Sequence, residues 1–199
     1  MVVTLAAFKG GVSKTTSAIH LAAYLAGNGK TLLADGDPNH SASSWAQRGS
    51  LPFDVLPAEE AIRRSGEYAH LVLDTEARPS HEELLELAEG CDLLILPTTP
   101  DALSLDALML TLEGLKGNYR ILLAITPPKP SKAADDMRAE LKGAGWPVFN
   151  HGVRRLAAFQ KAAMLGCLVQ DVPDPRAHLG WQDYQTIGKE VMKWVNSRG

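Results

Sequence analysis

The sequence contains few of the residues and patterns that are typical of secreted proteins, of membrane-spanning proteins or of strongly basic nucleic-acid-binding proteins. Its two cysteines, Cys91 and Cys167, lie far apart in apolar surroundings, which favours buried free thiols over a disulfide. It has no apolar run near the roughly 20 residues that a membrane-spanning helix needs, and no signal-peptide pattern at its start. The net charge of −3 excludes a global attraction to nucleic acid or to an anionic membrane. We therefore expect a soluble cytoplasmic protein, with any basic surface confined to a local patch.

What the sequence does contain is a glycine turn between a strand-like run and a helix-like run. Residues 9–16 read Lys-Gly-Gly-Val-Ser-Lys-Thr-Thr; an apolar, β-branched run precedes them, and residues 17–25 place apolar side chains at helical spacing. A turn in this position directs backbone N–H groups and the positive end of the helix dipole at one point, which favours phosphate binding. Lys14 can then reach the β- and γ-phosphates of a nucleotide, and the Thr15 hydroxyl can hold Mg²⁺.

This turn departs from the ordinary P-loop pattern at both of its glycine positions. Phe8 stands at the first position and Ser13 at the second, so the motif is instead the deviant Walker A form, with an additional lysine, Lys9, at its start. Two lysines, two glycines and two threonines at these offsets make a glycine turn with incidental lysines the weaker interpretation. Ser13 has to manage without the conformational freedom of glycine, or its hydroxyl adds a phosphate contact.

Apolar runs alternate with helix-like segments along the rest of the chain. The strand-like runs cover residues 2–7, 31–34, 70–73, 92–96 and 119–125, and the helix-like segments cover residues 17–26, 80–88, 104–115, 133–144, 155–165 and 184–195. Continuous apolar strands separated by helices predict an α/β fold, with a mostly parallel twisted sheet covered by helices on both faces. Residues 1–199 contain no repeat and no convincing linker, and a single domain is predicted.

Acidic residues follow two of the strand-like runs, at the sheet edge where α/β proteins gather their sites. Asp74 ends the run 70–73, where a carboxylate holds Mg²⁺ in nucleotide hydrolases; a strand-end cap is the alternative. The phosphate loop upstream favours the metal role. Asp35 and Asp37 flank Gly36 after another run, where they could orient an attacking water or simply form an Asp-Gly-Asp-Pro turn.

These motifs together resemble those of the ParA/MinD group of ATPases, most closely its small ParA-type (ParF-like) partition proteins. The resemblance rests on the deviant Walker A at residues 9–16, on residues 35–38 and on Asp74, and it extends to residues 44–49 and 96–104. It covers most of the chain and thins after about residue 130. It implies a P-loop NTPase fold, ATP and Mg²⁺ as cofactors, and an ATP-dependent homodimer that encloses the nucleotides.

The resemblance also implies roles for individual residues. The implied phosphate-binding set is Lys9, Gly10, Gly11, Val12, Ser13, Lys14, Thr15 and Thr16. Lys9 would cross the dimer to contact phosphate on the other subunit, and Asp37 would position the lytic water, so the implied catalytic set is Lys9, Lys14 and Asp37. The implied metal set is Thr15, Asp37 and Asp74. The loops that carry Pro127 and Pro173 would approach the base.

The function of such proteins is to position cargo. Members hydrolyse ATP when a partner protein stimulates them, and their ATP-bound dimers bind DNA without sequence preference. For this chain the resemblance implies an ATP hydrolase, weak without a ParB-like or other adaptor and nucleoid-associated when ATP-bound. Its cargo would be a plasmid, a chromosome or a protein organelle such as a carboxysome, and no membrane partner is expected. The candidate residues for contacts with DNA phosphates are Arg154, Arg155 and Lys161.

Two segments depart from the pattern of the group. Residues 75–79 are unusually charged, and Arg78 pairs either with phosphate or with Glu76. Asn39 and His40 stand where the group more often has glutamine, and His40 is favoured as a turn residue over a catalytic one.

Two other functions remain as alternatives. A MinD-like membrane-associated ATPase requires a C-terminal amphipathic anchor rich in Lys and Arg, whereas residues 184–195 carry Lys189 and Lys193 and an apolar face typical of a core helix. An amidoligase of the cobyrinic acid synthetase type shares this P-loop, but it generally needs a longer chain and a substrate pocket.

Overall fold

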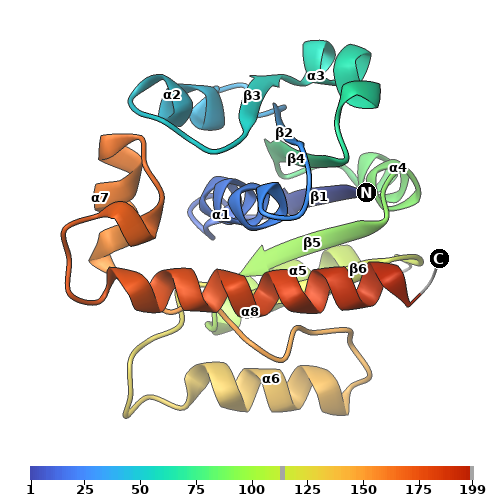
Figure 1. Cartoon of the computed structure of the whole chain (residues 1–199). Coiled ribbons are helices and arrows are strands. Elements are labelled where there is room, and N and C mark those ends of the chain that lie inside the picture. Colours follow the sequence, from blue (N-terminus) through green and yellow to red (C-terminus); the bar gives the residue numbers. More distant parts are fainter. Residues whose placement is uncertain (113–114, 198–199) are drawn as a thin grey trace.

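A parallel β-sheet runs through the centre of the computed structural model, which describes residues 1–112 and 115–197 (Figure 1). Its strands are β1 (Val2–Ala7), β2 (Thr31–Asp35), β3 (Asp54–Pro57), β4 (His70–Ala77), β5 (Leu93–Thr98) and β6 (Tyr119–Leu123). Within the described residues they form one six-stranded sheet in the order β3-β2-β4-β1-β5-β6, and the neighbouring strands are parallel. The predicted α/β fold with a parallel sheet is confirmed.

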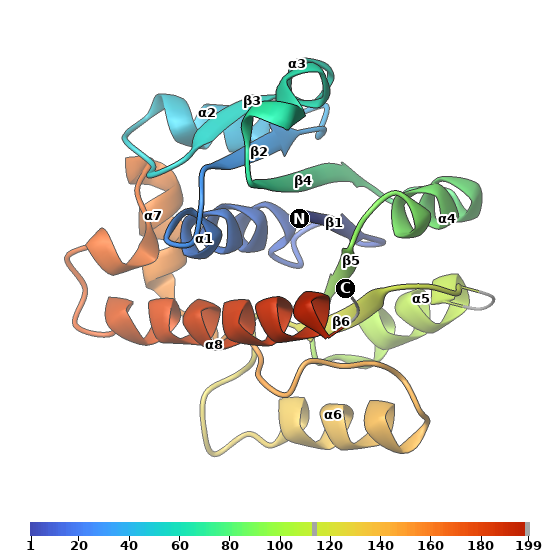
Figure 2. The same cartoon turned by 45° about the vertical axis from the view of Figure 1, so that its right-hand side comes forward.

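Helices follow the strands and cover both faces of this sheet. They are α1 (Lys14–Ala26), α2 (Ser41–Gln47), α3 (Ala58–Arg64), α4 (His81–Glu89), α5 (Ala102–Leu112), α6 (Ala133–Gly143), α7 (Ala157–Leu165) and α8 (Ala177–Asn196), with 3₁₀ turns η1 (Ser65–Glu67) and η2 (Val169–Asp171). Figures 1 and 2 show α1 and α8 side by side, and Figure 2 shows α4 and α5 across β5 from them. No described helix combines the length and the apolar composition that crossing a membrane requires.

The alternation of side chains along each strand explains why two cores form. In β5, Leu93 and Ile95 join the core beneath α1 and α8, whereas Leu94 and Leu96 join the core beneath α4, α5 and α6. In β2, Leu33 faces the first of these cores, and its neighbours pack with α3 on the other face. Because successive strand residues point to opposite faces, a strand covered on both faces needs an unbroken apolar run.

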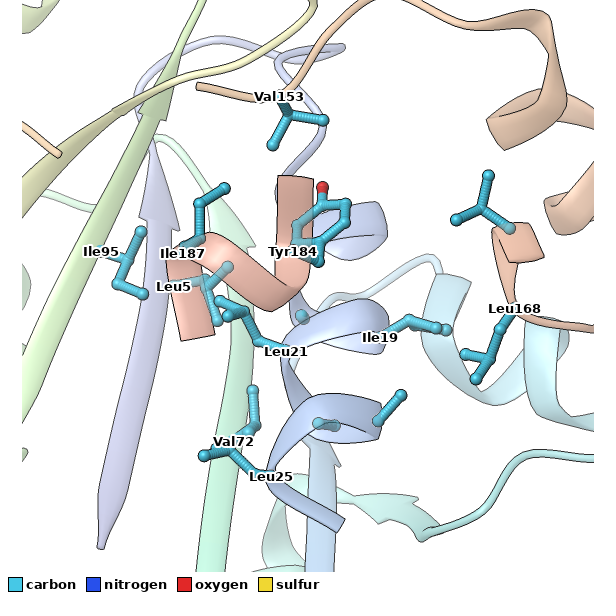
Figure 3. Close-up of a cluster of buried hydrophobic side chains, with 14 of the residues drawn as sticks. Leu5, Ile19, Leu21, Leu25, Val72, Ile95, Val153, Leu168, Tyr184 and Ile187 are labelled. Atoms are coloured by element: carbon cyan, nitrogen blue, oxygen red, sulfur yellow. The ribbon is translucent and has the colours of Figure 1, made fainter. Parts of the chain in front are cut away.

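The core beneath α1 and α8 joins the two ends of the chain. Figure 3 shows Tyr184 and Ile187 of α8 close to Leu5 of β1 and Leu21 of α1, and all four side chains are buried. The Tyr184 hydroxyl also shares a 2.9 Å hydrogen bond with the Ser17 hydroxyl in the first half of α1. The C-terminal helix therefore fixes the helix that follows the phosphate loop.

Three short elements, β3, α2 and α3, have no counterpart among the predicted elements. β3 has four residues, lies at the sheet edge and ends in Pro57, so it needs neither an apolar run nor a complete hydrogen-bond ladder. α8 begins at Ala177, ahead of the predicted start at Tyr184, because the segment around Gly180 packs closely on Phe159. Residues 113–114 of the predicted helix 104–115 lie outside the described residues.

The phosphate loop enters α1 through a left-handed residue. Ser13 has φ 70° and ψ 26°, a conformation that glycine adopts freely and that costs other residues free energy. Gly11 is left-handed as well, with φ 79°, and it adopts this backbone conformation without strain because it has no Cβ atom. The prediction that Ser13 manages without the freedom of glycine is confirmed, and its backbone is strained.

The substitution Ser13→Gly should raise the free energy of unfolding by about 0.5–1 kcal/mol. Relief of the left-handed strain, roughly 1–2 kcal/mol, outweighs the additional chain entropy that glycine loses on folding, about 0.5–1 kcal/mol. Urea denaturation without nucleotide measures the change, and Gly11→Ala, which creates the same strain, should shift stability the opposite way. A Ser13→Gly protein less stable than the parent would contradict the strain.

His20 is a fully buried histidine on α1. Its Nδ1 lies 2.7 Å from the Thr16 carbonyl oxygen, and the Val169 N–H donates to its Nε2 at 3.0 Å. Burial lowers the pKa of His20 to about 4, and the hydrogen bond with Thr16 only partly opposes this effect. The imidazole is therefore neutral in the folded protein near pH 7.

This lowered pKa makes stability fall as the pH falls. The pKa of His20 is about 4 in the folded protein against 6.5 for the ordinary group, so below pH 6.5 the unfolded chain binds a proton that the folded protein does not. We expect His20 to remove about 2 kcal/mol of stability between pH 7 and pH 5. Urea denaturation of the parent and of His20→Gln at both pH values measures the difference, and equal pH dependence in the two proteins would contradict the assignment.

Candidate nucleotide site

The residues predicted for the site converge at the carboxyl ends of β1, β2 and β4. β2 and β4 pair so that Asp35 lies opposite Asp74, and the phosphate loop leaves the adjacent strand β1. β4 does not end at Asp74, as the apolar run predicted; it continues because Ala77 pairs with Ala7 of β1. Parallel strands bring their carboxyl ends to one edge, which is why these distant residues meet.

Lys14 lies at the centre of this cluster. Its Nζ is 2.6 Å from Asp74 Oδ1 and 3.5 Å from Asp37 Oδ2. The same ammonium group also donates to the Thr75 carbonyl. The Lys14 side chain is 7% exposed and that of Asp74 is 0% exposed, so this ion pair is shielded from water. Buried charges are retained when they are paired, and this pairing fixes Lys14 beneath the phosphate loop.

Asp35 and Asp37 have different partners, although they are two residues apart. Asp37 Oδ1 accepts hydrogen bonds from the backbone and side chain of Asn39 at 2.9 and 3.0 Å. Burial opposes the shift, but the bonds from Asn39 and the charge of Lys14 hold the pKa of Asp37 below its usual value. Asp35 accepts from the Asp37 N–H at 3.2 Å and from the Ser43 N–H and hydroxyl at 2.8 and 2.6 Å. Asp35 therefore holds the turn, and Asp37 is the ionised carboxylate that faces Lys14.

Asp74 offers an oxygen that suits a metal ion. Burial raises the pKa of Asp74, against the opposing effects of Lys14 and the Thr15 hydroxyl. Its Oδ2 is buried and makes no hydrogen bond within the described part of the chain. Across residues 1–112 and 115–197, no three His, Cys, Asp or Glu side chains gather into a metal cluster. One carboxylate and one hydroxyl fit Mg²⁺, which completes its shell with phosphate oxygens and water.

A cavity of about 640 Å³ opens over the phosphate loop. All eight residues of the predicted phosphate-binding set line it, together with Asp37. The first turn of α1 carries no acidic residue of its own, so no side chain of this turn repels a phosphate at the positive end of the helix dipole. The volume lies within the range of small-molecule and cofactor sites, and the phosphate loop forms one side of it.

The cavity is also lined by apolar and polar residues that were not predicted for it. They are Ile125, Val153, Leu156, Phe159, Gln160 and Ala163. The cavity lining among the described residues does not include Pro127 or Pro173, and their contact with a base stays a prediction. Phe159 lies in a segment with ordinary helical spacing, so the sequence carries no signal that separates it from a core residue.

Lys9, predicted to act across a dimer, is held within its own chain. Its Nζ donates to Ser104 Oγ at 3.1 Å and lies 3.8 Å from Asp101 Oδ1. The Lys9 side chain is 46% exposed, so it stands at the rim of the cavity that it lines. No pattern in the sequence connects Lys9 with Asp101 or Ser104, about 95 residues away. Its contact with a second subunit stays a prediction.

The three basic residues predicted to contact DNA have different surroundings. Arg154 forms a two-pronged ion pair with the buried Asp183, with nitrogen–oxygen distances of 2.8 and 2.7 Å. Lys161 is exposed and pairs with Asp174 at 3.2 Å. Arg155 is exposed and lines the cavity next to the phosphate loop. Arg154 is therefore committed to a structural pair, and DNA binding by any of the three stays a prediction.

The two segments that depart from the pattern of the group, residues 75–79 and 39–40, follow Asp74 and Asp37 in the sequence. Arg78 has a left-handed backbone with φ 63°, and its N–H donates to the Ala7 carbonyl at 2.7 Å. Among the described residues no ion pair joins Arg78 to Glu76. His40 precedes α2 with φ 50°, and its N–H donates to the Asp37 carbonyl at 2.8 Å, as the favoured turn interpretation requires.

Solved structures share this fold at low sequence identity. A plasmid partition protein from Borrelia burgdorferi bound to AMPPNP superposes with a TM-score of 0.73 at 19% identity, over 96% of this chain and 98% of that one. The septum site-determining protein MinD from Pyrococcus horikoshii, complexed with Mg-ADP, gives a TM-score of 0.70 at 17% identity, over 100% of this chain and 99% of that one. ATP with Mg²⁺, the cofactors predicted from the sequence, correspond to the ligands in these two structures.

Sequence comparison identifies the family. A carboxysome distribution maintenance protein (protein A) from Gloeobacter kilaueensis is 33% identical over 194 residues, which is 92% of this chain and 90% of the relative. The model of the CobQ/CobB/MinD/ParA nucleotide binding domain matches residues 3–169, which include the phosphate loop, Asp37, Asp74 and α7. The resemblance seen in the motifs is confirmed, and the chain belongs to the CobQ/CobB/MinD/ParA nucleotide-binding family.

Proposed function

We propose that the chain, residues 1–199, is one ATPase domain that binds ATP with Mg²⁺ in this cavity, forms an ATP-dependent homodimer and positions a cargo in the cell. The observation that carries the proposal is the cluster of Lys14, Asp37 and Asp74 beneath the phosphate loop. The AMPPNP and Mg-ADP bound by the two solved relatives support the choice of ligand.

The charges of the cluster assign a role to each residue. Lys14 binds the β- and γ-phosphates, because it is the cation beneath the loop that cradles them. Asp37, which stays ionised, orients the attacking water with its carboxylate. Thr15 and Asp74 would hold Mg²⁺, which would neutralise phosphate charge when bound.

Dimerisation supplies the second cation of the proposed mechanism. Lys9 is half-exposed at the rim of the cavity, so release from Ser104 and Asp101 lets it reach a nucleotide on a second copy. A cation that arrives there stabilises the charge that develops on the γ-phosphate in the transition state. ATP then favours the dimer because the dimer binds it with one more contact than the monomer does.

The relatives indicate the kind of cargo. One is named for maintaining carboxysome distribution, and another for plasmid partition. We propose a carboxysome-like organelle or a plasmid, linked through an adaptor protein that stimulates hydrolysis. The ATP-bound dimer binds DNA phosphates without sequence preference, through Arg155 and Lys161 and through Arg154, which precedes Arg155 in the chain. In this state it is nucleoid-associated.

An electrophoretic shift assay with a random-sequence duplex at low salt tests this function. We expect the parent to retard the duplex with ATP but not with ADP, and raised salt to abolish the shift, because phosphate contacts are lost to counterions. Lys9→Ala should bind ATP, stay monomeric in light scattering and give no shift. The exposed Lys132→Ala is the matched control and should behave as the parent.

Two outcomes would contradict the proposal at different points. A parent that dimerises with ATP and leaves the duplex unretarded would exclude the DNA surface but keep the ATPase. A Lys9→Ala protein that forms the ATP dimer as readily as the parent would exclude the role of Lys9 across the dimer.

A further inference from the structure

His20 joins two segments that are far apart in the sequence. Its Nδ1 lies 2.7 Å from the carbonyl oxygen of Thr16, which directly follows Thr15 in the phosphate loop. Its Nε2 lies 3.0 Å from the backbone nitrogen of Val169, the first residue of η2. One buried side chain thus bridges the start of α1 and the turn that follows α7.

The partners of the ring determine its tautomer. A backbone N–H can only donate, so the bond from Val169 makes Nε2 an acceptor. The proton then lies on Nδ1, which donates to the Thr16 carbonyl. Both bonds require the neutral imidazole, and burial keeps it neutral because it lowers the pKa of His20 to about 4.

Three aromatic rings enclose the imidazole and connect it to the cavity. The His20 ring stacks on Tyr184, with centroids 4.9 Å apart and planes inclined by 19°. Phe159 and Trp45 meet it edge-on, with centroids at 5.3 and 6.0 Å. Phe159 belongs to α7 and lines the cavity, and Trp45 belongs to α2, which follows the Asp37 turn. The His20 ring therefore contacts side chains of α2, α7 and α8 in addition to its bonds within α1 and to η2.

We propose that His20 is a positioning residue for the bound nucleotide. It fixes the distance between the phosphate loop and α7, which lines the cavity and leads into η2. The inference rests on the proposed function, because the ligand that spans the cavity is ATP. If the His20 side chain only filled space, another ring could replace it without loss of ATP binding. A positioning residue instead needs a hydrogen-bond acceptor at the position of Nε2.

Substitutions that mimic one ring nitrogen each separate the two hydrogen bonds. In His20→Gln the amide oxygen takes the place of Nε2 and can accept from the Val169 N–H. In His20→Asn the amide takes the place of Nδ1, keeps the Thr16 bond and leaves the Val169 N–H without an acceptor. His20→Phe removes both bonds and keeps a ring in the aromatic enclosure. Leu25→Ala, a buried change near the end of α1, is the matched control for lost stability.

Calorimetric titration with ATP and with inorganic tripolyphosphate, both with Mg²⁺, tests the proposal. We expect His20→Asn and His20→Phe to raise the Kd for ATP by about tenfold or more, since without the bond to Val169 the segment that carries α7 and η2 is no longer held in the position that ATP requires. The Kd for tripolyphosphate should change less than about threefold, because that ligand contacts the phosphate loop alone. His20→Gln should restore ATP binding to within about threefold of the parent, and Leu25→Ala should bind both ligands as the parent does.

The outcomes separate this inference from the proposed function. Unchanged ATP binding in His20→Asn and His20→Phe, or an equal loss for both ligands, would overturn the positioning role while the parent still binds ATP. A parent that binds neither ligand would overturn the proposed function and the inference with it.

If the variants do not fold, nitrogen NMR of the parent, labelled at its histidines, tests whether His20 responds to ATP binding. The Nε2 resonance of His20 should report the Nδ1–H tautomer and shift when Mg-ATP is added. A resonance that does not move on ATP binding would overturn the coupling.

Discussion

The ion pair between Lys14 and Asp74 places two charges where water does not reach. An ammonium group has three hydrogens to donate, and the structure supplies three acceptors: Asp74 Oδ1, Asp37 Oδ2 and the Thr75 carbonyl. Because a buried charge without partners costs several kcal/mol, these acceptors have to stay together. The pair therefore fixes the phosphate loop over β4, and Asp37 brings the turn after β2 to the same point.

The packing of α8 shows whether this helix has the exposed apolar face of a membrane anchor. A MinD-like membrane anchor needs an exposed apolar face on a C-terminal amphipathic helix. In α8 the side chains of Tyr184, Ile187 and Val191 are fully buried against the sheet and α1. Near the end of the same helix, the Arg120 guanidinium lies 4.5 Å from the Trp194 ring centroid and pairs with Glu190 at 3.3 Å. The apolar face is engaged in the core along the helix, so α8 itself does not present the exposed face of such an anchor.

Much of the fold and the charged cluster could be predicted, because both depend on short patterns. The apolar runs predicted the central strands, and the spacing of Lys9, Lys14 and Thr15 predicted the loop between β1 and α1. Asp74 was recognisable because it follows an apolar run, and the parallel sheet then placed it beside Lys14. β3 was not recognisable, because a four-residue edge strand leaves no periodicity to detect.

The partners of individual side chains could not be predicted, because tertiary packing alone sets them. Lys9 meets Ser104, Arg154 meets Asp183 and His20 meets Val169, and no spacing rule connects residues so far apart. The distinction between Asp35 and Asp37 was likewise hidden, since it depends on the Ser43 contacts of α2. The one available hint for His20 was a polar side chain among the apolar residues of α1, which marks either a satisfied buried group or a functional one.

Calorimetric titration of Lys14→Ala and Asp37→Ala with Mg-ATP tests the central claim, that the cluster around Lys14 is a nucleotide site, most directly. Lys14→Ala should show no measurable binding. It removes the cation that contacts the phosphates, and it leaves Asp74 and Asp37 facing the phosphates as uncompensated negative charges. Asp37→Ala should still bind, since it loses a carboxylate and no phosphate contact. Binding of Mg-ATP to Lys14→Ala with the affinity of the parent would contradict the account.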